Sequence, residues 1–478
     1  MVNQAKRPNA AVLSFLVIAA TCILCTARSM AQLPGPPPEF FRDLQKPLDP
    51  SIKATFIPLG PGVPGVLYQP IAQGEKAQLG VFVMHAEGDY LRFSACTELS
   101  KRGYTVLCAN NTTPKGMVSL DLNLDQILLD ASYGVAYLRK MPGIKKVVLF
   151  GHSAGGAMMS AYQNIAENGL KACQGPEKVY KCSDRLSDIP PADGVMLVDS
   201  NWGLAGVMLF SLDPSVTDES SGRSIDPDLN LFNPKNGFNP NGSTYSAEFI
   251  HRFQSAVSKR NNFIVNSALD RLALINAGKG LYSDDEPFVV PGGILFGFNN
   301  KLFAQDIRLM SHTKKAWPLV HADGSITNEI VHSVRVAEAG ANTTPTLRGA
   351  VRGTVRTFLT TFAIRTTGAY GFDEDSVRGV DWSSNYGCPV GNAPGISVPM
   401  LVMGMTGHWE YLAAEDIYEA ARTSDKTVAF VEGASHIYST CKQCEKTSGQ
   451  YGDTTKTTYD YIDGWLSKKG RFIGLGQL

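Results

Sequence analysis

The pentapeptide Gly151-His152-Ser153-Ala154-Gly155 follows the apolar stretch Lys146-Val147-Val148-Leu149-Phe150 and leads into Gly156-Ala157-Met158-Met159. The stretch before it predicts a buried strand, and the small residues after it are compatible with a helix. A serine at the apex of such a turn can project its hydroxyl toward a base and backbone donors. The glycines permit the strained backbone that this turn needs. We therefore predict a nucleophile elbow with Ser153 as the nucleophile; a serine that merely caps a helix would leave the glycines unexplained.

The rest of the chain predicts an α/β architecture. Buried strand candidates are mostly separated by amphipathic helical stretches, such as residues 124–140 with their apolar positions at helical spacing. This alternation predicts a parallel sheet with helices on both faces. Two short apolar runs before it, residues 54–57 and 66–68, predict an antiparallel hairpin. The longer strand candidates are residues 79–84, 105–109, 146–150, 194–199, 399–403 and 427–431.

This order of elements, with an N-terminal hairpin and an elbow after the third long strand, resembles the α/β-hydrolase superfamily. The resemblance covers about residues 50–200 and 395–470, and it implies an α/β-hydrolase core in two parts, residues 51–200 and 396–478. Between them, over residues 201–395, the alternation stops and the chain becomes loop-rich, with a helix candidate at residues 247–260. Because a structureless loop of that length is implausible in a compact domain, we expect a mainly helical cap inserted after the sixth strand.

A serine nucleophile needs a base, and His436 lies in a glycine-containing turn directly after the last strand candidate. Its position and chain order match the catalytic histidine of the family. The family commonly places its acid after the penultimate strand, where Glu410 is the only carboxylate before a helix expected from residue 413. A glutamate can orient the imidazole as an aspartate does, so Glu410 is the predicted acid. Asp199, at the end of the preceding strand candidate, is the alternative.

The oxyanion formed on an attacked carbonyl needs N–H donors. The resemblance implies that one is the amide of Ala154, at the start of the elbow helix, where the helix dipole helps. The other is expected in the turn His85-Ala86-Glu87-Gly88 after the first long strand, although Ala86 stands where glycine is usual in the family. By position Glu87 supplies this amide, with Ala86 as the second choice.

The charge balance gives no reason to expect an anionic partner. The 44 Lys and Arg residues equal the 44 Asp and Glu residues, so no overall field attracts nucleic acid or an anionic membrane. We found no phosphate-cradling loop and no metal-ligand spacing, and we expect no cofactor and no metal. The expected partner is a small-molecule ester, and the oligomeric state is unknown. Serine at the elbow, rather than aspartate, argues against haloalkane or epoxide chemistry.

The N-terminus predicts export. Lys6 and Arg7 precede an apolar segment at residues 10–25, and Ser29-Met30-Ala31 offers a cleavage site, which together predict a signal peptide over residues 1–31. An uncleaved anchor is the alternative; after cleavage we expect no stable membrane insertion. Residues 32–50 are proline-rich and predict a surface arm.

Export makes disulfides the default for the remaining cysteines. Cys173 and Cys182 bracket a polar loop and are the predicted pair. Cys441 and Cys444 lack the preceding strand and helix of a thioredoxin-like redox motif and the second cysteine pair of a zinc site. The favoured interpretation is that one of them bonds Cys388.

Together these features predict a secreted serine hydrolase, extracellular or periplasmic, that cleaves a carboxylic ester with a hydrophobic part through an acyl-enzyme. An acyltransferase or an amidase or peptidase would use the same residues, and a binding module with a decayed triad is the non-enzymatic alternative. Apolar residues past the sixth strand could line an acyl pocket or form the core of the cap: Trp202, Leu204, Met208, Leu209, Phe210, Phe296 and Phe298.

Overall fold

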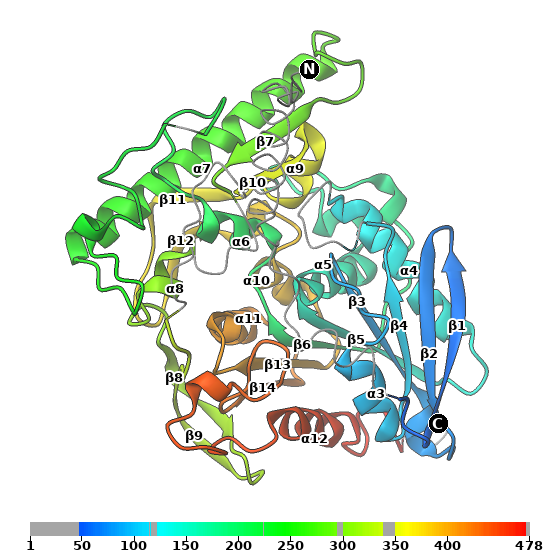
Figure 1. The fold of residues 1–478 in the computed structure, drawn as a ribbon. Helices are drawn as coiled ribbons and strands as arrows, with labels where there is room; N and C mark the ends of the chain where they lie inside the picture. Colours follow the sequence, from blue (N-terminus) through cyan, green and yellow to red (C-terminus); the bar gives the residue numbers. More distant parts are fainter. Residues whose placement is uncertain are drawn as a thin grey trace, which may run out of the picture. The chain divides into compact units, whose positions relative to one another are not determined.

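The centre of the computed structural model is a ten-stranded sheet in the order β1-β2-β4-β3-β5-β6-β13-β14-β8-β9 (Figure 1). β1 (Ile52–Gly60) and β2 (Val63–Pro70) form the predicted antiparallel hairpin, and β2 pairs antiparallel with β4. Along the stretch β4-β3-β5-β6-β13-β14 of this order, every pair of adjacent strands is parallel. Each overlaps a predicted strand: β3 (Leu79–His85), β4 (Thr105–Asn110), β5 (Lys146–Ser153), β6 (Gly194–Ser200), β13 (Met400–Met405) and β14 (Lys426–Val431).

The structure describes residues 47–113, 115, 122–222, 224–293, 300–337 and 349–474. The contacts of the site lie within one unit, Leu48–Leu478. The signal peptide predicted over residues 1–31 and nearly all of the arm predicted over residues 32–50 lie outside the described residues, as do Phe296 and Phe298.

Helices cover both faces of the sheet, as the alternation predicts (Figure 1). Successive strand residues point to opposite faces, so Val81 and Val83 pack in one core cluster while Phe82 and Met84 pack in the other. All four side chains are fully buried. One cluster lies under α3 (Ser94–Lys101) and α12 (Thr454–Leu466), and the other under α4 (Leu124–Lys140), α5 (Ala154–Asn168) and α11 (Ala413–Ala420).

Residues 201–395 contain strands as well as helices. β8 (His312–Val320) runs parallel to β14 and pairs with β9 (Ile326–His332), so this hairpin extends the central sheet. The pairing buries Leu319 and Val320 beside β14, which gives a physical reason for the strands to join the sheet. A mainly helical cap with the boundaries 201–395 therefore stays a prediction, and so do the core ranges 51–200 and 396–478.

The other elements of this range are α6 (Leu204–Ser211), α7 (Ala247–Asn276), α8 (Leu302–Gln305), α9 (Val355–Thr361), α10 (Pro389–Asn392) and two antiparallel pairs, β7 (Pro287–Pro291) with β10 (Ala350–Thr354) and β11 (Arg365–Phe372) with β12 (Val377–Asp381). Short 3-10 helices in the described ranges lie at Glu75–Gln78, Gly169–Ala172, Asp184–Leu186, Pro234–Asn236, Trp382–Ser384, Ala393–Gly395, Trp409–Leu412 and Lys442–Cys444.

Disulfides join Cys96 to Cys108, Cys173 to Cys182, and Cys441 to Cys444. The predicted Cys173–Cys182 pair is confirmed. The prediction that Cys388 bonds Cys441 or Cys444 is wrong, because Cys388 is a free thiol buried in the core under α4 and α5. Cys441 and Cys444 belong to a separate small cluster with Tyr451.

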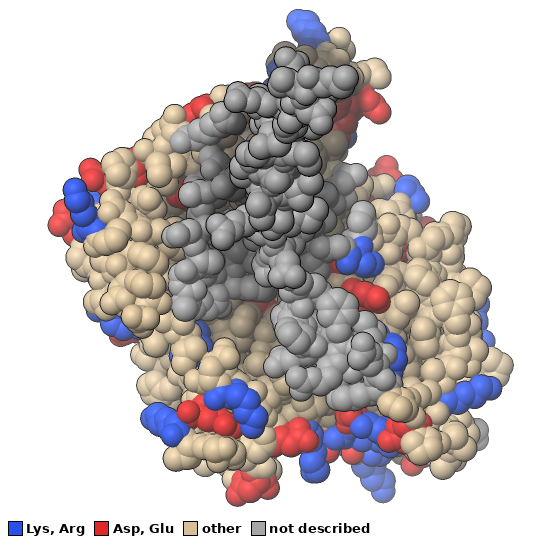
Figure 2. Space-filling view, viewed as in Figure 1, with Lys and Arg blue, Asp and Glu red and all other residues tan. Residues whose placement is uncertain are grey.

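Acidic and basic side chains are interspersed on the described part of the face shown in Figure 2, as the charge balance of the sequence leads one to expect. Within the described ranges, no helix is both long and apolar enough to span a membrane.

Candidate active site

Ser153 lies where β5 ends and α5 begins, in the predicted strand–turn–helix. Its φ of 54° is rare for a non-glycine residue, so the junction is strained. A Cβ added at Gly151 would lie 2.5 Å from the carbonyl oxygen of Gly155, and one added at Gly155 would lie 2.7 Å from that of Met84. Both contacts are with backbone, which cannot move aside cheaply. Glycines at these two positions therefore permit the tight turn that carries Ser153.

The predicted base, His436, lies in the loop after β14, and its Nδ1 is 2.7 Å from Oδ2 of Asp199. Asp199, the penultimate residue of β6, has a φ of 48° and is completely buried. Its other oxygen, Oδ1, accepts a hydrogen bond from the backbone N–H of Met405 at 2.9 Å. A carboxylate that accepts both bonds leaves the proton on Nδ1 of His436 and the lone pair on Nε2, where a base needs it.

The charge state of Asp199 supports this arrangement. Burial alone would disfavour the carboxylate, but the hydrogen bond from His436 and the nearby ring of His408 lower the pKa of Asp199 below its ordinary value. Burial also opposes protonation of His436, yet Glu410 and Asp199 together raise the pKa of His436 above the ordinary histidine value. A protonated imidazole at His436 is thus stabilised where it lies.

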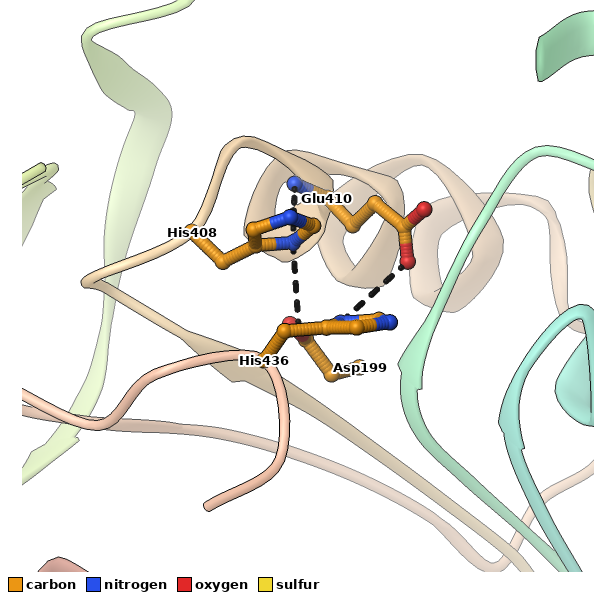
Figure 3. Close-up of side chains that lie close together, drawn as sticks. All are labelled: Asp199, His408, Glu410 and His436. Atoms are coloured by element: carbon orange, nitrogen blue, oxygen red, sulfur yellow. Dashed lines mark hydrogen bonds and ion pairs between the residues drawn. The ribbon is translucent and has the colours of Figure 1, made fainter. Parts of the chain in front are cut away.

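Glu410, the predicted acid, lies beside the same imidazole, and the dashed line between the two in Figure 3 marks an ion pair and not a hydrogen bond. Its Oε2 is 3.5 Å from Nδ1 of His436, and this buried oxygen has no hydrogen-bond partner among the described residues. Burial raises the pKa of Glu410 to about 7, with His436 lowering it and Asp199 raising it further. Distance and hydrogen bonding therefore favour the alternative acid, Asp199, over Glu410.

His408 forms the other side of this cluster. Its ring centroid is 4.2 Å from that of His436, and its Nδ1 is 3.6 Å from Oδ2 of Asp199. Figure 3 shows the two imidazoles lying one above the other. Burial and the neighbouring His436 lower the pKa of His408 to about 4, so this ring is neutral at neutral pH.

Asp199, His408, Glu410 and His436 each offer a ligand atom, and these atoms lie within 4.8 Å of one another. Two nitrogens and two oxygens are a donor set that zinc accepts. Two ligands of a tetrahedral zinc ion lie about 3.3 Å apart, however, given Zn–N and Zn–O distances near 2.0 Å. The 2.7 Å separation of His436 and Asp199 is a hydrogen-bond distance, so the cluster as it stands fits a shared proton better than a metal ion.

In the turn after β3, the amide predicted to bind the oxyanion, that of Glu87, already has an acceptor. The backbone N–H groups of Glu87 and Gly88 donate to Nδ1 of His85 at 3.0 Å and 2.7 Å. Burial lowers the pKa of His85 to about 3, so its ring is neutral and Nδ1 can accept both bonds. The amide of Glu87 is thus already engaged, whereas the N–H of Ala86 has no hydrogen-bond acceptor within the described part of the chain. This geometry favours Ala86, the second choice, as the donor from this turn.

The side chain of Glu87 is buried, and neither carboxylate oxygen has a hydrogen-bond partner among the described residues. Burial raises its pKa to about 8, an effect that Lys115 opposes. A neutral carboxyl at this place avoids repelling an oxyanion. The N–H of Ala154, the other predicted donor, belongs to the first residue of α5 and so has no acceptor inside the helix.

Within the described ranges no hydrogen bond joins Ser153 Oγ to His436. The loop of His436 is nevertheless held against the elbow, because Nε2 of His152 lies 2.7 Å from the carbonyl oxygen of His436 and the two rings are 4.4 Å apart. The bond between a nucleophile and its base is often long without substrate. The sequence analysis missed His152, although its place directly before the predicted nucleophile was a signal.

The candidate acyl-pocket residues that the structure describes are core residues. Trp202, Leu204, Met208, Leu209 and Phe210 are all buried in the cluster under α4 and α5. Trp202 also donates from Nε1 to Asp416 at 2.8 Å. These side chains therefore pack in the core, and the hydrogen bond of Trp202 joins this part of the core to α11.

The hairpin, the parallel sheet, the elbow after β5 and the histidine loop after β14 define an α/β-hydrolase fold. No family model matches the sequence, and no curated protein sequence matches it either. Among solved structures, Est1E from Butyrivibrio proteoclasticus is 11% identical, with a TM-score of 0.35 over 86% of this chain and 97% of that chain.

EstE7, described as an HSL homologue from a metagenome library, is 12% identical, with a TM-score of 0.38 over 89% of each chain. An acylaminoacyl peptidase from Pyrococcus horikoshii is 10% identical, with a TM-score of 0.38 over 92% of this chain and 44% of that one. Likenesses at TM-scores below 0.5 are too weak to carry an inference, so the fold is defined by the chain's own sheet order and elbow.

Proposed function

We propose that this protein is a serine hydrolase in which Ser153 is the nucleophile, His436 the base and Asp199 the acid. The observation that carries the proposal is the hydrogen bond between Nδ1 of His436 and buried Asp199, made by a loop that docks against the strained elbow of Ser153. Glu410, the acid favoured by chain order, is instead the second carboxyl beside the imidazole.

In the proposed reaction, Ser153 Oγ attacks an acyl carbonyl carbon while its proton passes to Nε2 of His436. The negative charge on the carbonyl oxygen is bound by the N–H groups of Ala154 and Ala86. Collapse of the intermediate breaks the bond to the leaving group, which takes the proton from Nε2. Water then attacks the acyl-enzyme by the same route and releases the acid.

The proposed substrate is a carboxylic ester with a hydrophobic part. Serine rather than carboxylate chemistry at the elbow and the neutral overall charge support an uncharged acyl substrate. The disulfides support export to an oxidising compartment.

A fluorophosphonate probe tests the proposal, because it reacts with an activated serine and not with an ordinary hydroxyl. We expect labelling of the wild-type protein, none of Ser153→Ala, and at least a hundredfold slower labelling of His436→Ala. An unlabelled wild type, or labelling that survives Ser153→Ala, would contradict the mechanism. Matched ester and amide substrates, with and without an acceptor alcohol, then separate hydrolysis of esters from amidase and acyltransferase activity.

A further inference from the structure

His152 joins the elbow strand to the loop that carries His436. Its Nε2 lies 2.7 Å from the main-chain oxygen of His436, and its Nδ1 lies 2.5 Å from the hydroxyl of Tyr90. The residue is only 2% exposed. Because both ring nitrogens have a partner, the ring cannot turn without losing a hydrogen bond inside the core.

The acceptor at Nε2 decides the tautomer of His152. A carbonyl oxygen can only accept, so Nε2 carries the hydrogen and Nδ1 has the lone pair. Burial, reinforced by His436, holds the pKa of His152 well below its ordinary value and keeps the ring neutral. Tyr90 must then donate to Nδ1, and burial holds the pKa of this phenol well above its ordinary value.

The surrounding rings fix this chain of hydrogen bonds in place. Phe93 stacks on His152 with ring centroids 5.0 Å apart, and Tyr90 stacks on His85 at 4.5 Å. His85 in turn accepts the two amides of the turn after β3. One connected set of side chains therefore links the candidate oxyanion turn, the elbow and the loop of His436.

We propose that His152 is a positioning residue, whose Nε2–H holds the main chain of His436 at the distance from the elbow that lets the imidazole reach Ser153. This inference rests on the proposed function. The bond is well placed to position His436, since His152 directly precedes the proposed nucleophile in the chain. Its other ring nitrogen, Nδ1, is fixed by a hydrogen bond from the hydroxyl of Tyr90. A displacement of about 1 Å at a reacting group can cost about a hundredfold in rate.

Two substitutions separate positioning from packing. His152→Gln and His152→Met both remove the aromatic ring and both leave a long unbranched side chain, but only the glutamine amide can donate to the carbonyl of His436. With a chromogenic short-chain ester, we expect His152→Met to lower kcat roughly a hundredfold and to change KM less than about threefold. We expect His152→Gln to have a kcat at least about tenfold above that of His152→Met.

Equal kcat values for the two variants, or a loss confined to KM, would overturn the inference. Thermal unfolding monitors whether both variants fold. If His152→Met does not fold, Tyr90→Phe replaces it: loss of the donor to Nδ1 is expected to lower kcat roughly tenfold at constant KM, and an unchanged kcat would overturn the inference. Failure of the fluorophosphonate to label the wild type would instead refute the proposed function, so the two failures are distinguishable.

Discussion

Replacing Asp199 with asparagine tests the acid most directly, because the surroundings of Asp199 dictate which way the new amide must point. Oδ1 accepts from the N–H of Met405 at 2.9 Å, and Oδ2 accepts from Nδ1 of His436 at 2.7 Å. Only the oxygen of asparagine can replace Oδ1, so the NH2 group must face His436. Nδ1 then has to accept, the proton moves to Nε2, and the base is lost.

The expected loss of kcat in Asp199→Asn is large. A wrong tautomer of this kind costs about 10⁴-fold in kcat in the serine protease triad, which corresponds to about 5.4 kcal/mol of transition-state stabilisation. Glu410→Gln is the matched control, since it neutralises the second carboxyl at 3.5 Å without breaking a hydrogen bond to His436. For this variant we expect a loss below about tenfold in kcat.

The assay is steady-state hydrolysis of a chromogenic ester, with the fluorophosphonate labelling rate as a second measure. Retention of more than about a tenth of kcat in Asp199→Asn would refute the reasoning. A Glu410→Gln variant as inactive as Asp199→Asn would return the role of acid to Glu410. Thermal unfolding of both proteins guards against a loss that merely reports misfolding.

Three further outcomes are expected. In a pH–rate profile, kcat/KM rises with pH as His436 loses its proton. Because Glu410 and Asp199 raise the pKa of His436, the midpoint of this rise should lie above the ordinary histidine pKa, and Glu410→Gln should move the midpoint to lower pH. Gly155→Ala places a Cβ 2.7 Å from the carbonyl oxygen of Met84, so it should cost about 2–4 kcal/mol in chemical denaturation and slow labelling, whereas an unchanged midpoint would contradict the steric argument. Removing the Cys173–Cys182 bond by double substitution to serine should destabilise the protein by about 2–3 kcal/mol, and a smaller shift than about 1 kcal/mol would show that the loop needs no crosslink.

The fold was predictable where the local pattern was unambiguous. α4 covers Leu124–Lys140 as predicted, because its apolar residues keep helical spacing and Asn123 caps its start by accepting from the N–H of Gln126. α7 continues to Asn276, well past the predicted end at residue 260. The polar run at residues 259–262 interrupts the apolar pattern, but Arg260 is buried there and donates two hydrogen bonds to the carboxylate of Glu219. The helix continues because Arg260 has a partner, Glu219, that is distant in the sequence and therefore absent from the local pattern.

The absence of distant partners from local sequence patterns also explains why the geometry favours Asp199 over Glu410 and Ala86 over Glu87. Asp199 lies near the end of β6, and Glu410 follows the adjacent strand β13, so both come near the loop after β14 and chain order cannot choose between them. Glu87 has the expected place in the turn after β3, but its amide is taken by Nδ1 of His85. That bond depends on burial lowering the pKa of His85, which is a property of the packed core.

The two carboxyl groups beside His436 differ in the partners that each one has. Asp199 accepts from a backbone N–H and from the imidazole, and its pKa falls below the ordinary value. Glu410 is also buried, but its Oε2 has no hydrogen-bond partner among the described residues, and burial raises its pKa to about 7. Two like charges at this spacing disfavour each other, so the group with the better hydrogen bonds takes the charge and the other stays largely protonated up to neutral pH. In the proposed mechanism Asp199 is therefore the counter-ion of the imidazolium, and Glu410 adds a second negative charge only as the pH rises.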